Sequence, residues 1–428
     1  MAAAAGQVGL RKNTSNLFRH RADTARAHID VRDFDRVLDV NADEGWVDVE
    51  GMTPYGALAD ATLAAGVMPC VVPQLKSITI GGAVSGLGIE ASSFRYGLVH
   101  ETVESMDVLL ADGEVVNCTP DNEHSDLFHG LPNSYGTLGY ILKLRARTVP
   151  VKGYVRLHHR RYGQAGAFFA ALESACDSQA DFVDGVIFGP GEYVVTEGRH
   201  VDSAPYTSDY SYERIFYRSL RERDEDFLST RDFLWRWDTD WFWCSKNLGM
   251  ENPLLRRLAG RKRLNSTFYT RVMRWNGRHG WSGRLDRLRG LHSESVIQDI
   301  CIPIAQAEAF YDFLAAEIGV FPIWTCPARH RPDLPTPLFP MNEDVLYVDF
   351  GFWDVIKTRE AHPAGHFNRL IERRTAELGG AKSLYSEAFY ERDEFWSIYN
   401  EPHYRALKAR YDPNGRLRDL YDKCVLRA

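Results

Sequence analysis

The spacing of apolar positions divides the chain into two blocks of mixed strands and helices. Alternation of apolar and polar residues is typical of half-buried strands, whereas a spacing of three to four residues is typical of helices. Alternation dominates the first block, and its last alternating run ends near Pro150. Thr53 and Pro54 predict the start of a helix, and Gly66 predicts its end. The strands predicted in this block are 29–31, 37–40, 46–50, 67–73 and 140–147, with a hairpin through 111–113.

The second block, from residue 151 onward, is richer in aromatic residues and predicts a mixed sheet with helices on one face. Because 428 residues exceed one typical hydrophobic core, we expect two domains, residues 1–150 and residues 151–428. Both blocks together predict an α+β fold. The second block predicts helices at 163–176, 304–319 and 363–378, and strands at 182–188, 294–303 and 345–352.

Composition and charge exclude several classes of protein. The net charge of −7 gives no basic footprint for nucleic acid. Seven cysteines are scattered without a Cys-x-x-Cys pair, which is typical of reduced thiols in a cytoplasmic protein, and no cluster of metal ligands occurs. No apolar run reaches 18 residues, so we expect no membrane span. The sequence therefore predicts a cytoplasmic protein without bound metal or nucleic acid.

The most informative segment for function is the glycine-rich stretch from Thr79 to Gly97. Without a Cβ, a glycine backbone can take positive φ and approach a ligand closely, and consecutive N–H groups can bind phosphate. A second glycine turn, 133–139, leads into the alternating strand that begins at Tyr140, so both turns are predicted to contact one nucleotide. The alternative is a β-bulge with tight backbone packing. The glycines in question are Gly81, Gly82, Gly86 and Gly88.

The segments Thr79–Gly82 and Ser134–Gly139 resemble the flavin-binding domain of the vanillyl-alcohol-oxidase type of FAD enzymes. The match is nearer to one branch, the delta-24 sterol reductases and their bacterial relatives, and it covers nearly the whole chain. Further segments that carry this resemblance are Val72–Leu75, Gly88–Gly97, Leu109–Gly113, Cys118–Pro120, Ser125–Phe128, Val296–Asp299, Phe321–Pro327, Asp393–Trp396 and Leu420–Lys423.

The resemblance implies a PCMH-type FAD-binding domain with two subdomains, then an α+β substrate cap domain whose carboxy-terminal tail returns to the flavin. It also implies non-covalent FAD, because the turn at 11–16 has no histidine where covalent family members carry their flavin link. Polar groups of this turn would bind the pyrophosphate, and an exposed polar turn is the alternative. The residues expected to contact FAD are Thr14, Ser15, Asn16, Thr79, Ile80, Gly81, Gly82, Ala83, Ser85, Gly86, Gly88, Ile89, Glu90, Gly136, Thr137 and Leu138.

The same resemblance implies a lipid substrate with an isolated carbon–carbon double bond, either a methylene-branched fatty acyl chain or the Δ24 alkene of a sterol side chain. Because no carbonyl polarises such a bond, we expect protonation of one carbon and hydride transfer from flavin N5 to the other, with NADPH as reductant. The acid should come from the cap or the tail. We expect Tyr385 and Glu387 on one face of a strand as donors, Asp349 as a further candidate, and Lys423 beside the reduced flavin.

Two other functions stay open at this point: an oxygen-using oxidase of a polyol or sugar, and a lipid-binding protein without catalysis. An apolar cavity over the flavin would favour the reductase. The aromatic segment Phe233–Trp243 is followed by basic residues, which predicts peripheral contact with the inner face of the cell membrane. The alternative is that these rings form the core of the cap domain.

Overall fold

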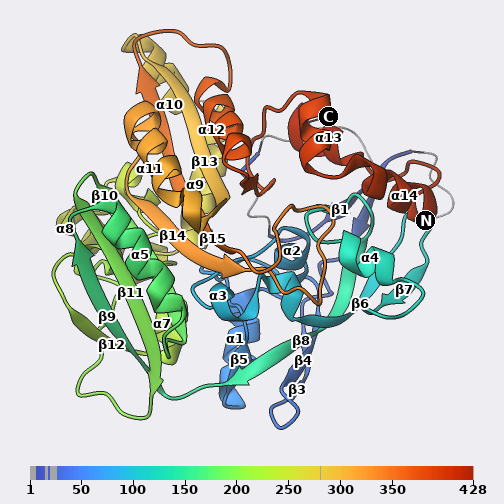
Figure 1. The fold of residues 1–428 in the computed structure, drawn as a ribbon, viewed down its shortest axis with the longest axis horizontal. Coiled ribbons are helices and arrows are strands. Elements are labelled where there is room, and N and C mark those ends of the chain that lie inside the picture. Colours follow the sequence, from blue (N-terminus) through green and yellow to red (C-terminus); the bar gives the residue numbers. More distant parts are fainter. Residues whose placement is uncertain (1–5, 15–17, 20–26, 280, 428) are drawn as a thin grey trace.

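The computed structural model describes residues 6–14, 18–19, 27–279 and 281–427 and contains two large sheets (Figure 1). A six-stranded sheet ends at Pro150 and an eight-stranded sheet begins at Tyr154, so the expected domain boundary falls between them. Neighbouring strands run antiparallel within both sheets. The predicted α+β class is confirmed.

The first sheet has the strand order β3-β4-β8-β6-β7, and β5 pairs with the end of β8. Val49 and Leu144 alternate into its core, whereas Arg145 faces outward and pairs with Asp48 at 2.8 Å. A separate parallel pair, β1 and β2, precedes this sheet. The strands are β1 (Val8–Arg11), β2 (Ala27–Asp30), β3 (Val37–Asn41), β4 (Trp46–Glu50), β5 (Val67–Pro69), β6 (Val103–Leu109), β7 (Val115–Cys118) and β8 (Tyr140–Pro150). The helices are α1 (Tyr55–Ala64), α2 (Ile80–Ser85), α3 (Ser93–Tyr96) and α4 (Ser125–Gly130), with a 3-10 turn at Val99–Thr102.

Two local expectations for this domain are wrong. Helix α1 begins at Tyr55 after Pro54, and the Thr53 side chain makes no capping bond. Instead, the Thr53 carbonyl accepts a hydrogen bond from the Ile80 amide, so this residue joins the start of α1 to the start of α2. Strand β5 ends at Pro69 rather than at residue 73, because the chain beyond it leaves the sheet toward α2.

The second sheet has the order β12-β9-β11-β10-β14-β15-β13-β16, and helices cover one of its faces (Figure 1). Phe168, Phe310 and Ile371 from three of these helices are fully buried against the strands. The strands are β9 (Tyr154–Tyr162), β10 (Phe182–Gly189), β11 (Glu192–Val201), β12 (Glu225–Ser229), β13 (His292–Pro303), β14 (Ile323–Arg329), β15 (Leu346–Thr358) and β16 (Ala381–Lys382). The covering helices are α5 (Ala165–Cys176), α11 (Ala307–Phe313) and α12 (His366–Glu377), and the helical and strand segments predicted in this block agree with them.

Strict alternation along β13 and β15 gives this sheet two different faces. Ile300 and Phe350 belong to the core under the helices, so Asp299, Asp349 and Trp353 lie on the opposite face, toward the first domain. The antiparallel register sets Cys301 opposite Asp349 and sets Asp299 opposite a glycine. Acidic and aromatic side chains are therefore concentrated where the two domains meet.

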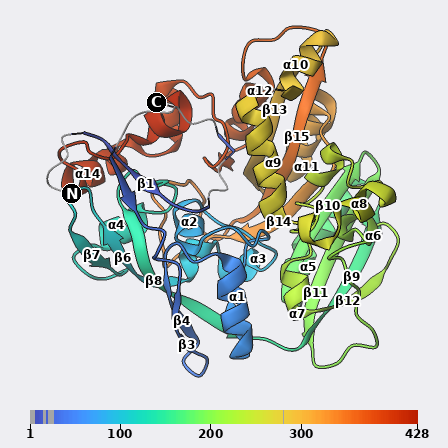
Figure 2. The ribbon, with the colours of Figure 1, turned by 180° about the vertical axis from the view of Figure 1, so that it is seen from behind.

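The remaining helices lie behind this sheet or return to the first domain (Figures 1 and 2). Lys408 of the tail donates to the Thr137 carbonyl at 2.8 Å, so the carboxy-terminal segment packs on the first domain as expected. No helix within the described ranges has the length and apolar character needed to cross a membrane. The helices are α6 (Phe216–Ser219), α7 (Thr230–Leu234), α8 (Pro253–Ala259), α9 (Ser266–His279), α10 (Trp281–Leu288), α13 (Arg392–Ile398) and α14 (Glu401–Tyr411), and shorter helical turns lie at Cys244–Leu248, Arg261–Arg263, Ile304–Gln306, Leu314–Ile318 and Asp422–Leu426.

Candidate active site

A cavity of about 1180 Å³ lies between the two domains. Its walls come from β1, from α2 and the loop after it, from the start of β8, from the inner face of the second sheet and from the carboxy-terminal tail. Ligand cavities for drug-sized molecules measure roughly 300–1,000 Å³, so this one has room for a large cofactor together with part of a second molecule.

Helix α2 forms one wall of the cavity and contains Gly81 and Gly82, the first glycines of the stretch Thr79–Gly97. We expected Gly81 and its neighbours to take positive φ and offer their amides to phosphate, and this is wrong for the start of the segment. The amides of Ile80 and Gly81 donate instead to the carbonyls of Thr53 and Gly51. None of the four glycines at 81, 82, 86 and 88 has positive φ. A Cβ on Gly81 would lie 2.8 Å from the Gly51 oxygen. The missing side chain therefore lets α2 pack directly on the backbone beneath it.

The second glycine turn lies against the first, as expected. The Tyr135 amide donates to the Ser85 carbonyl at 3.3 Å, which joins the turn to the end of α2. Gly136 has a φ of +73°, and a Cβ there would lie 2.9 Å from the ring of Tyr140. Only glycine suits this position without strain. Both turns border the same cavity.

The cavity lining has a strong excess of positive charge. Among the described residues it includes six lysine or arginine residues but only one carboxylate, that of Asp299. One of these cations, Lys423 of the tail, donates to the Tyr135 carbonyl at 2.6 Å. Such a surplus is suited to a ligand with two phosphate groups. The six are Arg11, Lys12, Arg19, Arg274, Arg418 and Lys423.

Aromatic rings from distant parts of the chain line another part of the cavity. Phe242 stacks on Trp353 with ring centroids 4.3 Å apart, and Phe18 lies 5.6 Å from Trp241. The Trp353 indole N–H donates to the Tyr385 hydroxyl at 2.9 Å, so its polar atom is satisfied. This part of the cavity therefore presents mainly apolar surface to a ligand.

Backbone strain also concentrates here. Eight non-glycine residues have positive φ in the part of the chain that the structure describes, and four of them line the cavity. Two are consecutive bulky residues, Trp241 at 46° and Phe242 at 58°. Such conformations are costly for large side chains and cluster at functional sites. The other two are Leu87 and Tyr135.

Asp299 is the acidic group of the cavity. Its Oδ1 is enclosed by protein and has no hydrogen-bond partner among the described residues. Burial, with a smaller contribution from the nearby charge of Asp349, raises the pKa of Asp299 well above its usual 3.8, and a hydrogen bond with Tyr385 offsets this only in part. Burial therefore favours the protonated form of this cavity carboxyl.

Asp349 lies on the same face of the sheet as Asp299, on the neighbouring strand, and is absent from the cavity lining. The Cys301 thiol donates to its Oδ1 at 3.5 Å, while Oδ2 has no partner among the described residues. Burial raises the pKa of Asp349 to about 7. Asp349 is therefore a charged neighbour of Asp299 that does not border the cavity, and its predicted role as a proton donor stays a prediction.

The residues expected to contact the flavin or to act in catalysis fall into three groups: residues that line the cavity, residues absent from its lining, and residues outside the described ranges. Those that line the cavity are Thr14, Thr79, Gly81, Gly82, Ala83, Ser85, Gly86, Gly88, Ile89 and Gly136, together with Tyr385 and Lys423. Those absent from the lining are Ile80, Glu90, Thr137, Leu138, Asp349 and Glu387, whereas Ser15 and Asn16 lie outside the described residues.

Glu90 belongs to a buried ion cluster that joins the domains. Arg236 donates to Glu90 at 2.7 Å and to Asp184 at 2.9 Å, and all three side chains are almost fully buried. Burial raises the pKa of Glu90, and the charge of Arg236 lowers it in part. This carboxylate therefore takes part in a contact between the domains and is absent from the cavity lining, and its expected contact with the cofactor stays a prediction.

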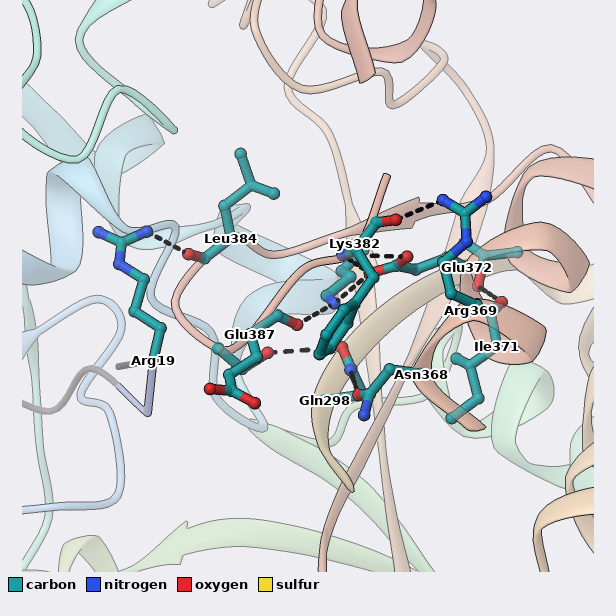
Figure 3. Close-up of polar contacts among 12 residues, drawn as sticks. Arg19, Gln298, Asn368, Arg369, Ile371, Glu372, Lys382, Leu384 and Glu387 are labelled. Atoms are coloured by element: carbon teal, nitrogen blue, oxygen red, sulfur yellow. Dashed lines mark hydrogen bonds and ion pairs between the residues drawn. The ribbon is translucent and has the colours of Figure 1, made fainter. Parts of the chain in front are cut away.

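Glu387 lies in the segment that returns from the second sheet to the tail, and the strand expected there is absent. Figure 3 shows Lys382 between the Glu372 carboxylate, at 2.8 Å, and the Glu387 carbonyl, at 2.5 Å. The Glu387 carboxylate extends away from this pair and lies 3.3 Å from Arg427. The expected placement of Tyr385 and Glu387 on one strand face is therefore wrong, and only Tyr385 reaches the cavity.

The aromatic segment Phe233–Trp243 is buried, so its expected contact with a membrane is wrong. Trp237 and Trp243 are almost fully buried, and Trp241 lines the cavity. The adjacent Arg236 is neutralised by acidic residues distant in sequence, which allows the whole segment to enter the core.

Comparison with known proteins agrees with this geometry. Residues 2–119 match the family model described as an FAD binding domain. The human Delta(24)-sterol reductase is 27% identical over 402 residues, which cover 90% of this chain and 75% of that protein. The chain is an FAD oxidoreductase homologous to Delta(24)-sterol reductases. The reductase of Arabidopsis thaliana is 25% identical over 92% of this chain and 76% of its own length. A shorter match, 28% identity over 36% of this chain and 30% of the relative, is to cytokinin dehydrogenase 1 of Oryza sativa subsp. japonica.

FAD fits the cavity on two observations of this structure. The volume accommodates a dinucleotide, and the cations of β1 and the tail suit its diphosphate. Sequence reasoning missed Asp299, although alternation along 296–302 sets it on the face opposite Val296 and Ile300. It also missed the aromatic residues at 241, 324 and 353, since no sequence pattern indicates which rings meet in space.

Proposed function

We propose that this FAD oxidoreductase reduces an isolated carbon–carbon double bond of a lipid, with NADPH as electron donor. The observation that carries the proposal is the combination of aromatic walls with one enclosed carboxyl in the same cavity. Aromatic rings offer a flat apolar surface to a hydrocarbon chain or ring system, and the carboxyl offers a proton.

FAD would be held along α2, by Gly136 and by the cations of β1 and the tail. Once reduced, it supplies a hydride. Lys423 would orient the Tyr135–Gly136 turn through its bond to the Tyr135 carbonyl, and its charge would stabilise an anionic cofactor.

An unpolarised alkene requires a proton at one carbon while the other gains cationic character. Asp299 supports this role because it faces the cavity, because burial favours its protonated form, and because its Oδ1 has no partner among the described residues. Tyr385 orients it, and aromatic rings around the second carbon would stabilise positive charge. A positioned general acid contributes about 100- to 10,000-fold in rate.

The relatives named as Delta(24)-sterol reductases support a sterol side chain as one substrate, and a methylene-branched acyl chain presents the same type of alkene. The aromatic lining speaks against a polyol or sugar oxidase, whose substrate needs many hydrogen-bond partners. The cation set beside the glycine turns speaks against a lipid-binding protein without a cofactor.

The test is anaerobic titration of the flavoprotein with NADPH and with NADH, followed by mixing with each alkene lipid. We expect NADPH to bleach the flavin absorbance and one lipid class, methylene-branched phospholipid or side-chain-unsaturated sterol, to restore it. If neither lipid reoxidises the flavin, and admission of air then reoxidises it rapidly with release of peroxide, the protein is an oxidase.

A further inference from the structure

Exposed hydrophobic side chains concentrate in one short part of the second domain. Thirteen large hydrophobic residues are exposed among the described residues, and seven of them fall between positions 248 and 288. Leu258 is 78% exposed and Leu288 is 86% exposed. Single exposed apolar residues are ordinary, whereas several that belong to helices on one face of the molecule (Figure 2) can form an interaction surface. We call this set the helical surface; it consists of Leu248, Leu254, Leu255, Leu258, Met273, Trp275 and Leu288.

The same part of the chain is strongly basic. Residues 252–290 contain eleven lysine and arginine residues and a single acidic residue, Asp286, whereas the whole chain has a net charge of −7. Asp286 is buried and pairs with Lys357 at 2.9 Å. Three of the eleven cations, Arg256, Arg257 and Arg261, pair with acidic residues outside this stretch, and the stretch still has a surplus of positive charge. Exposed leucines in a basic stretch complement a surface that is apolar inside and anionic outside, namely a bilayer of anionic phospholipid.

Helix α9 connects the helical surface to the cavity. Arg274 of α9 lines the cavity, while its neighbours Met273 and Trp275 are exposed. On the inner side, Tyr269 of α9 stacks parallel to Trp241, which also lines the cavity, with centroids 6.4 Å apart. Figure 2 shows α8, α9 and α10 on the face of the molecule away from the covering helices. One helix therefore separates the helical surface from the aromatic part of the cavity.

We propose that the helical surface docks on anionic phospholipid bilayers, with its leucines in the interface and its cations at the phosphates. Delivery of a membrane lipid past α9 into the cavity rests on the proposed function, but docking itself does not. A second copy of this chain is a poorer occupant, because a symmetric contact would bring two basic surfaces together. Nucleic acid would leave the exposed leucines unused.

The test is flotation of the FAD-loaded protein with vesicles, without any substrate. We expect binding to vesicles that contain phosphatidylglycerol, little binding to phosphatidylcholine alone, and loss of binding as salt screens the charges. Replacing Leu254, Leu258 and Leu288 together by serine should weaken binding about tenfold or more, because these side chains lose their apolar contact with the bilayer. The matched control replaces Leu38, Val115 and Leu426, which are exposed elsewhere, and should bind normally.

Equal binding by both triple variants, or no binding to anionic vesicles, would overturn the docking proposal. Concentration-dependent dimers that the leucine variant abolishes, without vesicle binding, would overturn it in favour of self-association. Retention on DNA in place of vesicles would overturn it in favour of nucleic acid. Because the leucine variant should still reduce a detergent-solubilised alkene at the normal rate, failure of docking and failure of the proposed reaction give different results.

Discussion

Replacement of Asp299 by asparagine tests the assigned proton donor. Asparagine keeps the shape of the side chain, which matters because a Cβ on the facing Gly351 would already lie 3.1 Å from Asp299 Oδ1 and 2.6 Å from the Trp353 ring. The amide cannot release a proton to an alkene carbon. The variant should therefore fold and bind FAD normally but fail in the protonation step.

The expected loss follows from what a positioned acid supplies. General acid catalysis contributes about 100- to 10,000-fold, which corresponds to about 3–5 kcal/mol of transition-state stabilisation. The loss should appear in the rate of alkene reduction and not in the rate at which the flavin is reduced by its nicotinamide donor. Binding of the lipid should change little, since the aromatic walls remain.

The pH profile provides a sharper readout. Asp299 must be protonated to act, so the rate should fall as pH rises through its raised pKa. Above about pH 7, Asp349 is charged and disfavours ionisation of Asp299. In Asp349→Asn that charge is gone, which lowers the pKa of Asp299. The falling limb of the profile should therefore move to lower pH, while the rate at low pH stays nearly unchanged.

The assay is anaerobic rapid mixing of chemically reduced protein with the alkene lipid, followed at the flavin absorbance. This measurement isolates the step that needs the acid. A normal reoxidation rate in Asp299→Asn would refute the assignment of the donor. A limb that moves to higher pH in Asp349→Asn would refute the electrostatic reasoning.

Two further changes test residues that support the site. Lys382→Ala would remove the ion-pair partner of the fully buried Glu372, so the free energy of unfolding in urea should fall by about 3–5 kcal/mol. The control Lys152→Ala breaks an exposed pair and should lower it by less than about 1 kcal/mol. Equal losses would contradict the role of burial. Gly136→Ala forces a side chain into positive φ and against Tyr140, so the flavin-to-protein absorbance ratio of the purified protein should drop, and a full complement of flavin would show that this turn does not need glycine.

Much of the fold is predictable from local pattern. Alternation fixes strands such as β13 and β15 because both of their faces are specified by neighbouring residues, and Pro150 marks the end of the first sheet. The glycine segment at 79–88 was predicted at the right place but in the wrong conformation. Gly81 serves close packing on Gly51, a contact that depends on a distant residue and leaves no periodic signal.

The sequence predicts site residues only where they lie together in one segment, and not where the cavity brings distant segments together. Asp299 sits on a face that alternation defines, yet only the tertiary structure reveals that this face borders a cavity. The tryptophans of Phe233–Trp243 stand beside arginines, and sequence cannot distinguish a membrane interface from a core. This segment is part of the core because Glu90 and Asp184, which belong to other parts of the chain, neutralise Arg236.

The account depends on a flavin and a lipid alkene meeting in one cavity between the two domains. The most direct measurement is a single anaerobic turnover of the reduced protein with one equivalent of alkene lipid, followed by mass analysis of the lipid. We predict one saturated lipid, heavier by one pair of hydrogens, for each flavin oxidised. A flavin that stays reduced with every alkene, with all lipid recovered unchanged, would contradict it.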